Sequence, residues 1–287
     1  MESLKKILFL NTLRLIYLCC VAILLFSCDE EKPKPNEQNN RVISLAVPKT
    51  PAISYSLIST YPHDSTCFTE GLFFHQGKLF ESSGAPDNIP TTRSLFGIVD
   101  IQTGKIAVKG ELDRNKYFGE GIVALNNKLY QLTWQGQTGF IYNADNFKKL
   151  GTFSYMSKEG WGLTTNGKEL IMSDGTNTLT FIDPETFQIT KTLLVSENNY
   201  AVDYLNELEY IKGYLYANIW MTTRIVKIDP ETGNVVGQMD LGSFAAEAKK
   251  RYKGSLEMNG IAYDSITDKI LITGKMWPTL YQINFPH

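Results

Sequence analysis

The amino-acid sequence predicts an all-β protein, and more narrowly a five-bladed β-propeller whose ring is closed by an N-terminal strand. Two observations lead to this prediction. Short apolar or aromatic alternations separated by turns run from about residue 52 to the end of the 287-residue chain, which is the pattern of an all-β domain. Within this region a unit of three or four strands recurs five times, at spacings of 41 to 53 residues. That period is typical of propeller blades.

The repeat is clearest in the first strand of each unit, where a polar or aromatic residue and usually a glycine precede an apolar residue. The five copies are Glu70-Gly71-Leu72, Glu120-Gly121-Ile122, Trp161-Gly162-Leu163, Asn206-Glu207-Leu208 and Asn259-Gly260-Ile261. A second apolar strand follows seven residues later in the first four units and nine residues later in the fifth. A third strand ends in a turn such as Asp229-Pro230-Glu231-Thr232-Gly233, in which proline presets φ and glycine accepts a positive φ.

The ends of the repeat region predict how the ring closes. The fifth unit stops at Tyr281-Gln282-Ile283 without an outer strand, whereas a surplus strand at residues 54–60 precedes the first unit. We expect the early strand to complete the last blade, because this pairing leaves neither edge open. The alternative, a β-sandwich with a second domain, does not explain the fixed seven-residue offset. One short surface helix is expected at residues 244–252.

The first 28 residues are expected to be a bacterial lipoprotein signal. Lys5, Lys6 and Arg14 precede an apolar run at residues 15–26, and a small residue precedes Cys28. This order is that of a secretory signal. The end of the run, Leu25-Phe26-Ser27-Cys28, resembles a lipobox, whose cysteine is lipidated and becomes the mature N-terminus. The alternative is a single transmembrane anchor, but the run is short for the roughly 20 residues that a membrane helix needs.

The predicted domain organisation follows from this signal. Residues 29–50 are acidic at first and then rich in Pro, Asn and Gln, so we expect a polar tether that contributes no core. Residues 51–287 form the propeller domain. The protein is then expected in the cell envelope, periplasmic or surface-facing, and in contact with the membrane only through its lipid anchor.

Composition excludes several classes of function. The 28 basic and 30 acidic residues leave a formal charge of -2, so no nucleic-acid partner is expected. The three histidines are scattered and the four cysteines show no CxxC spacing, so no zinc site can be assembled from ligands close in sequence. We expect no metal and no cofactor. The sequence also lacks the GxSxG, GxxxxGK[ST] and GxGxxG motifs, which are the common signatures of hydrolases, nucleotide triphosphatases and dinucleotide-binding enzymes.

Two columns of the repeat predict a binding site, because the inner strand of a propeller blade lines the central channel. The first column, just before the repeated glycine, contains Glu70, Glu120, Trp161, Asn206 and Asn259. The second column, five residues beyond the apolar position of the second strand, contains Gly84, Trp134, Gly175, Trp220 and Lys275. Aromatic and polar groups converging at one mouth indicate a small-molecule pocket. The alternative is a wet channel with indoles packed between blades, and His63 is expected in a loop or in the core.

A set of short motifs resembles the plant-type glutaminyl-peptide cyclotransferases, the glutamine cyclotransferase family. The motifs occur in order between residues 54 and 285 and are His63-Asp64, Phe68-Thr69-Glu70-Gly71-Leu72, Phe118-Gly119-Glu120-Gly121, Leu132-Thr133-Trp134, Glu159-Gly160-Trp161-Gly162-Leu163, Asn206-Glu207-Leu208-Glu209, Asn218-Ile219-Trp220 and Asn259-Gly260-Ile261-Ala262. The resemblance implies a five-bladed propeller enzyme that converts the N-terminal Gln of peptides to pyroglutamate and releases ammonia without a catalytic metal.

The resemblance also implies roles for individual residues. It places the catalytic carboxylate on Glu120, a supporting lysine on Lys275 and an asparagine on Asn206, with the indole pocket formed by Trp134, Trp161 and Trp220. Plant members commonly carry Gln where this chain has Glu70, and we expect Glu70 to receive the substrate's α-ammonium group. The expected partner is a peptide or protein with an N-terminal Gln, acted on by a monomer. Two rivals are a non-enzymatic propeller lipoprotein that binds a peptide or glycan at the same mouth, and a propeller hydrolase.

Overall fold

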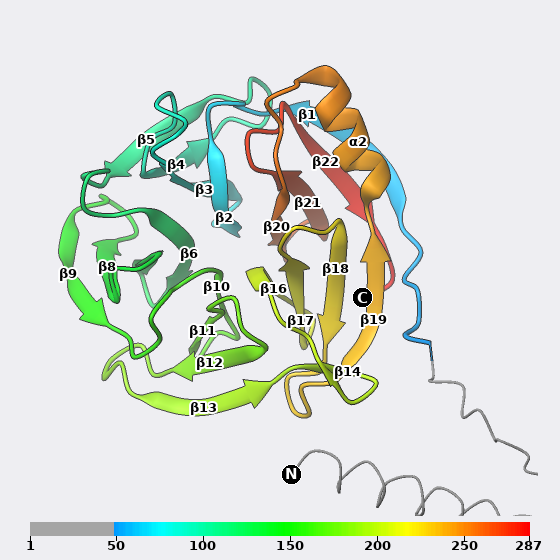
Figure 1. Ribbon diagram of the computed structural model, residues 1–287. Helices are drawn as coiled ribbons and strands as arrows, with labels where there is room; N and C mark the ends of the chain where they lie inside the picture. Colours follow the sequence, from blue (N-terminus) through cyan, green and yellow to red (C-terminus); the bar gives the residue numbers. More distant parts are fainter. Residues whose placement is uncertain (1–48) are drawn as a thin grey trace, which may run out of the picture. The chain divides into compact units, whose positions relative to one another are not determined.

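Residues 49–287 are described by the computed structural model; the predicted signal, Cys28 and the predicted tether up to residue 48 lie outside the described residues. Twenty strands form five antiparallel sheets of four strands each. Figure 1 shows these sheets as blades around a central axis. The predicted five-bladed propeller is therefore confirmed.

Four blades are meanders whose strands follow chain order from the axis outward. The first and second blades are β2 (Phe68–His75), β3 (Lys78–Gly84), β4 (Leu95–Val99) and β5 (Ile106–Glu111), then β6 (Gly119–Leu125), β7 (Lys128–Thr133), β8 (Thr138–Asn143) and β9 (Lys149–Ser154). The third and fourth are β10 (Leu163–Thr165), β11 (Leu170–Met172), β12 (Thr178–Ile182) and β13 (Ile189–Leu194), then β16 (Leu205–Ile211), β17 (Tyr214–Ile219), β18 (Arg224–Ile228) and β19 (Val235–Asp240).

The fifth blade joins the two ends of the domain. It contains β20 (Met258–Asp264), β21 (Lys269–Gly274) and β22 (Thr279–Asn284), with β1 (Ser56–Pro62) as the outer strand. Strand β1 pairs antiparallel with β22, so the predicted closure is confirmed, with the early strand beginning two residues later than expected. Just before β1, the Ile53 amide donates to the Gln238 carbonyl at 2.8 Å, which fixes the start of the domain to β19.

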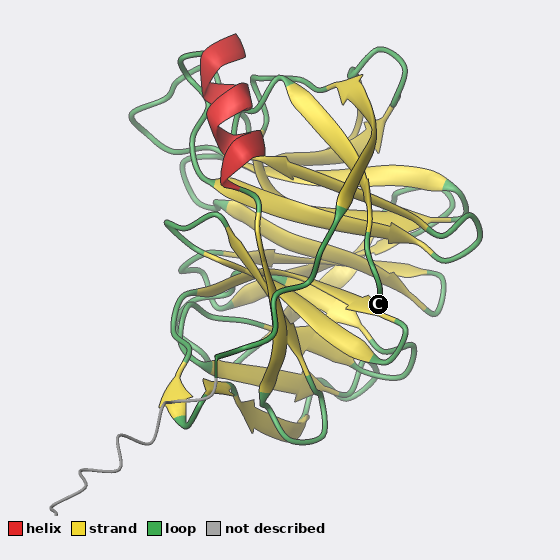
Figure 2. Cartoon of the chain, turned by 90° about the vertical axis from the view of Figure 1, so that its right-hand side faces the viewer, coloured by secondary structure: helices red, strands yellow, loops and turns green. Residues whose placement is uncertain are grey.

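A helix and a short hairpin lie outside the five sheets. The expected helix is confirmed as α2 (Gly242–Arg251), which lies at the edge of the molecule beside the fifth blade (Figure 2). The short hairpin of β14 (Ser196–Glu197) and β15 (Tyr200–Ala201) was not predicted, because strands of two residues show no alternation. No helix within residues 49–287 is long and apolar enough to cross a membrane.

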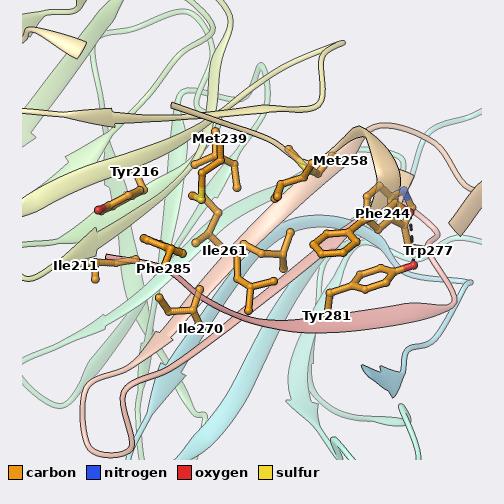
Figure 3. Close-up of a cluster of buried hydrophobic side chains, with 14 of the residues drawn as sticks. Ile211, Tyr216, Met239, Phe244, Met258, Ile261, Ile270, Trp277, Tyr281 and Phe285 are labelled. Carbon is orange, nitrogen blue, oxygen red and sulfur yellow. Dashed lines mark hydrogen bonds between the residues drawn. The ribbon is translucent and has the colours of Figure 1, made fainter. Parts of the chain in front are cut away.

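The core consists of five apolar clusters, each between two neighbouring blades. The cluster between the fourth and fifth blades is shown in Figure 3 and includes Tyr216, Met239, Ile261 and Tyr281. Helix α2 adds Phe244, whose ring stacks on Tyr281 with centroids 4.5 Å apart. Every blade buries both of its faces against neighbouring blades. This packing explains why the strands of each repeat are rich in apolar residues.

At the axis, the inner strands approach too closely for side chains at the repeated glycine. A Cβ atom on Gly71 would lie 2.8 Å from the Ile122 amide nitrogen, and one on Gly162 would lie 2.1 Å from the Asn206 carbonyl oxygen. Real Cβ atoms do not approach backbone atoms this closely. Gly71 and Gly162 are therefore packing requirements of the ring, whereas Gly260 of the fifth blade has a φ of +121°, a conformation that side chains disfavour.

The fourth blade breaks this rule, since it carries Glu207 where the other blades carry glycine. The buried Glu207 carboxyl group accepts hydrogen bonds from the Leu72 amide at 3.1 Å and from the Ile261 amide at 2.8 Å. Leu72 belongs to the first blade and Ile261 to the fifth. The Glu207 side chain therefore accepts a backbone hydrogen bond from each of two other blades close to the axis.

We predict that Glu207→Ala lowers the free energy of unfolding by about 2–5 kcal/mol, because it leaves two buried N–H groups without an acceptor. Urea denaturation followed by circular dichroism measures this loss. Glu207→Gln keeps one acceptor oxygen and should fall between the wild type and the alanine variant. Glu231→Ala, in the exposed β18–β19 turn, is the matched control and should change stability by less than about 0.5 kcal/mol. An equal effect of both alanine variants would contradict the assignment.

Candidate active site

The first predicted column is presented by β-bulges. Each of the inner strands β2, β6, β16 and β20 gains one residue on its partner strand at the same place in the blade. A bulge turns side chains out of the regular ladder and re-aims them. The residues at the four bulges include Glu70, Glu120, Asn206 and Asn259, which are four of the five residues of the first predicted column. The fifth, Trp161, lies just before β10, which pairs with β11 without a bulge.

The second predicted column lies at the ends of the second strands. Trp134 directly follows β7, Trp220 follows β17 and Lys275 follows β21. These side chains therefore emerge at the same end of the channel as the bulges.

All seven predicted site residues line one pocket of about 450 Å³: Glu70, Glu120, Trp134, Trp161, Asn206, Trp220 and Lys275. This volume is ordinary for a small-molecule site. The remaining lining residues, to which the sequence analysis gave no role, are Phe68, Pro86, Asn88, Ile89, Phe118, Leu256 and Glu257. They come from the ends of inner strands and from loops, where no repeat marks them.

Glu70 is held by two neighbours on the floor of the pocket. Its Oε1 atom lies 2.7 Å from Lys275 Nζ, and its Oε2 atom accepts a hydrogen bond from Asn259 Nδ2 at 3.0 Å. Burial raises the pKa of Glu70 to about 7, although the charge and hydrogen bond of Lys275 oppose the rise. Glu70 and Lys275 thus form a buried pair whose acidic member titrates near neutral pH.

Glu120 is buried beside this pair, with 5% of its surface exposed. Burial raises its pKa well above the ordinary value, the negative charge of Glu70 raises it further, and Lys275 opposes both effects. Within residues 49–287 its carboxyl group has no hydrogen-bond partner, in contrast to Glu70. A buried carboxyl group of raised pKa that is free to bond a ligand has the properties of a general acid or base.

Asn206 adds hydrogen-bonding capacity to the pocket floor. Its carbonyl group accepts from Ser173 Oγ at 2.7 Å, which fixes the main chain. Its Oδ1 atom is buried without a partner in the described part of the chain, as are Asn218 Nδ2 and Asn259 Oδ1. Such atoms are rarely left unpaired in proteins, and of the three residues only Asn206 lines the pocket, where it can bind a ligand or water.

The three predicted indoles form the wall. Trp161 and Trp220 meet edge to face, with ring centroids 5.6 Å apart. A residue without a predicted role, Glu159, joins Trp161 to Trp134: its Oε2 atom accepts a hydrogen bond from each indole Nε1 at 2.9 Å. The Glu159-Gly160-Trp161 motif places Glu159 next to a predicted site residue. Nothing in the sequence, however, indicates that Glu159 contacts Trp134.

The wall continues through two phenylalanines. Phe118 contacts Trp134 with ring centroids 6.0 Å apart and Phe68 with centroids 5.9 Å apart. Lys275 Nζ lies 4.6 Å from the Phe68 ring centroid, a distance at which the ring face attracts a cation. The lysine is therefore held between Glu70 and an aromatic face.

Other candidate residues lie apart from the pocket. His63 is buried, 3.0 Å from Glu81 Oε2 and 2.7 Å from the Trp277 carbonyl oxygen, so it is a core residue, as expected. Trp277 is fully buried and donates to the Leu256 carbonyl at 2.9 Å. Residues 49–287 contain no group of three or more His, Cys, Asp or Glu side chains placed to hold a metal ion.

Comparisons with known proteins place the chain in a family and agree with its fold. The family model for glutamine cyclotransferase matches residues 21–285. The glutaminyl-peptide cyclotransferase of Arabidopsis thaliana is 40% identical over 229 residues, covering 79% of this chain and 70% of the relative. The crystal structure of Myxococcus xanthus glutaminyl cyclase matches with a TM-score of 0.74 and 31% identity, over 83% of this chain and 98% of the other. With its propeller, its pocket and these similarities, the chain belongs to the glutamine cyclotransferase family.

Proposed function

We propose that the protein is a glutaminyl-peptide cyclotransferase, which converts the N-terminal Gln of a peptide or protein to pyroglutamate and releases ammonia. The observation that carries this proposal is Glu120, a buried carboxyl group of raised pKa that has no hydrogen-bond partner among residues 49–287 and lies in a pocket lined by indoles. The names of the relatives from Arabidopsis thaliana and Myxococcus xanthus support the same activity.

The enzyme has to supply a proton carrier and not a nucleophile, because the nucleophile is part of the substrate. The substrate's α-amine attacks its own γ-carboxamide carbon, a C–N bond forms, and the bond to the carboxamide nitrogen breaks. In the mechanism we propose, Glu120 takes a proton from the attacking amine and delivers it to the departing nitrogen, which leaves as NH3. General acid–base catalysis of this kind typically contributes about 10²–10⁴-fold. Because burial raises the pKa of the Glu120 carboxyl group above its ordinary value, its carboxylate is a stronger base than a solvated one and can accept and then return the proton.

The remaining residues position the substrate and stabilise charge. The indoles exclude water and hold the flexible glutaminyl side chain in the rotamer that cyclises, which lowers the entropic barrier. Asn206 and Lys275 are assigned to the carboxamide oxygen as negative charge develops on it. Glu70 is assigned to the α-ammonium group, for which a carboxylate held by Lys275 and Asn259 still has free lone pairs.

Ammonia release from defined peptides tests this function. Peptides that begin with Gln should turn over, whereas peptides that begin with Asn should not, because one fewer methylene would require a strained four-membered ring. Acetylation of the α-amine should abolish turnover. Ammonia from the acetylated peptide would identify an amidase instead, and binding without ammonia from any peptide would identify a non-enzymatic binding protein.

We predict that Glu120→Gln lowers kcat by about 10²-fold or more and leaves KM nearly unchanged, because the amide keeps the size of the side chain but cannot carry the proton. Single-turnover cyclisation of a Gln-initiated peptide measures the loss, with circular dichroism as the control for folding. Cyclisation near the wild-type rate would transfer the role to Glu70, the other carboxylate of the column.

Two substitutions should shift the acidic limb of the pH profile of kcat/KM in opposite directions. The base must be ionised, so activity rises with pH through the pKa of Glu120. Glu70→Gln removes a negative charge that raises this pKa, so the limb should move to lower pH. Lys275→Met removes a positive charge that lowers it, so the limb should move to higher pH. Titration of the substrate amine is common to all variants, so shifts in the same direction would contradict the assignment.

We also propose that Cys28 is lipidated and anchors the domain in the cell envelope. The support is the Leu25-Phe26-Ser27-Cys28 sequence and the polar residues that follow it. Cys28→Ala should release soluble protein or leave the signal uncleaved, as judged by membrane fractionation and intact mass. Unchanged fractionation and mass would reject the anchor. The monomeric state stays a prediction, which sedimentation of residues 51–287 can test.

A further inference from the structure

Glu159 joins two blades through side chains. Its Oε2 atom accepts hydrogen bonds from Trp134 Nε1 and from Trp161 Nε1, both at 2.9 Å. Trp134 follows the second strand of the second blade, whereas Trp161 precedes the first strand of the third. The other oxygen, Oε1, accepts only from Gln135 Nε2, at 3.2 Å, in the described chain.

Main-chain bonds tie the same segment to the reactive centre. The Gly160 amide donates to the Trp134 carbonyl at 2.9 Å, so the Glu159–Trp161 segment is held against Trp134 twice. The Trp161 carbonyl in turn accepts from the Gly121 amide at 2.8 Å. Gly121 is the neighbour of Glu120, so the orientation of the two indoles is set directly beside the proposed proton carrier.

The carboxylate is the suitable group at this position. An indole N–H is a donor only, and it needs an acceptor when it is not solvated. Burial raises the pKa of Glu159, but the hydrogen bonds from Trp161, Gln135 and Trp134 outweigh burial, so the pKa lies below its ordinary value. The side chain is therefore ionised at neutral pH and accepts both bonds.

We propose that Glu159 is a positioning residue that holds Trp134 and Trp161 as one rigid wall against the glutaminyl side chain of the substrate. This inference rests on the proposed function and extends it to a residue that touches the indoles and not the reacting atoms. Both indoles share a single oxygen atom, so the arrangement depends on that one acceptor.

Kinetics of three variants test the proposal with a Gln-initiated peptide. Glu159→Ala should raise KM by about tenfold and change kcat by less than about threefold, because an apolar wall binds the ground and transition states alike. Glu159→Gln keeps one acceptor oxygen and should restore KM to within about threefold of wild type. Glu159→Asp keeps the charge but shortens the side chain, so its oxygen no longer reaches the indoles and its KM should resemble that of Glu159→Ala. This variant replaces Glu159→Ala in the test if the alanine variant does not fold. Glu185→Ala, a surface carboxylate bound to Lys128 outside the pocket, is the control.

A double-mutant cycle shows whether Glu159 acts through the indoles. In a Trp134→Phe and Trp161→Phe background both side chains stay aromatic, although smaller, and both N–H groups are gone, so Glu159→Ala should then change KM by less than about twofold. An unchanged KM in Glu159→Ala with only a lower Tm would overturn the proposal, as would a loss confined to kcat or an equally large effect in the Phe background.

Tryptophan fluorescence separates failure of this proposal from failure of the proposed function. Trp134 is 39% exposed, and release from Glu159 should increase its quenching by acrylamide in Glu159→Ala relative to wild type and Glu159→Gln. If no peptide releases ammonia, the proposed function fails while this readout still tests the shared hydrogen bonds. Equal quenching in all three proteins would show that Glu159 does not hold the wall.

Discussion

The close approach of five inner strands around one axis is the constraint on which the rest of this structure depends. It excludes a Cβ atom at Gly71, Gly121 and Gly162, whose ideal Cβ positions lie 2.8, 2.4 and 2.1 Å from neighbouring backbone atoms. Four of the five inner strands also carry a bulge near the axis. The residues at those bulges cannot continue the ladder, so their side chains turn towards the end of the channel. The packing of the ring thereby builds the pocket.

The same crowding sets the chemistry of the pocket. Carboxyl groups placed at bulges near the axis are desolvated, and burial is the largest cause of the raised pKa of both Glu70 and Glu120. The positive charge of Lys275, whose Nζ atom lies 2.7 Å from Glu70 Oε1, limits the rise of both pKa values. Within residues 49–287 Glu70 is hydrogen-bonded to its neighbours and Glu120 is not, so two carboxyl groups of the same column have different surroundings. The indole wall adds apolar surface to the same pocket.

The sequence by itself determined the blade number, the ring closure and seven of the fourteen residues that line the pocket. It could do so because a propeller repeats one local unit, and equivalent positions of a repeat lie on a ring about the axis. Glu120 and Lys275 stand 155 residues apart in the chain, yet each belongs to a column that recurs in every blade. The two-residue strands β14 and β15 carry no such periodicity, and for that reason they were not predicted.

Only the tertiary structure decided which side chains bond across blades. Glu207 stands in the glycine column, and its bonds to Leu72 and Ile261 require the geometry of the closed ring. Glu159 was part of a recognised motif, but its bond to Trp134 joins two blades whose separation no local pattern gives. Asn259 was placed in the correct column, whereas its hydrogen bond to Glu70 depends on the first and fifth blades meeting. Repetition specifies positions around the axis, but a hydrogen bond between blades is formed only when the ring brings its donor and acceptor within about 3 Å.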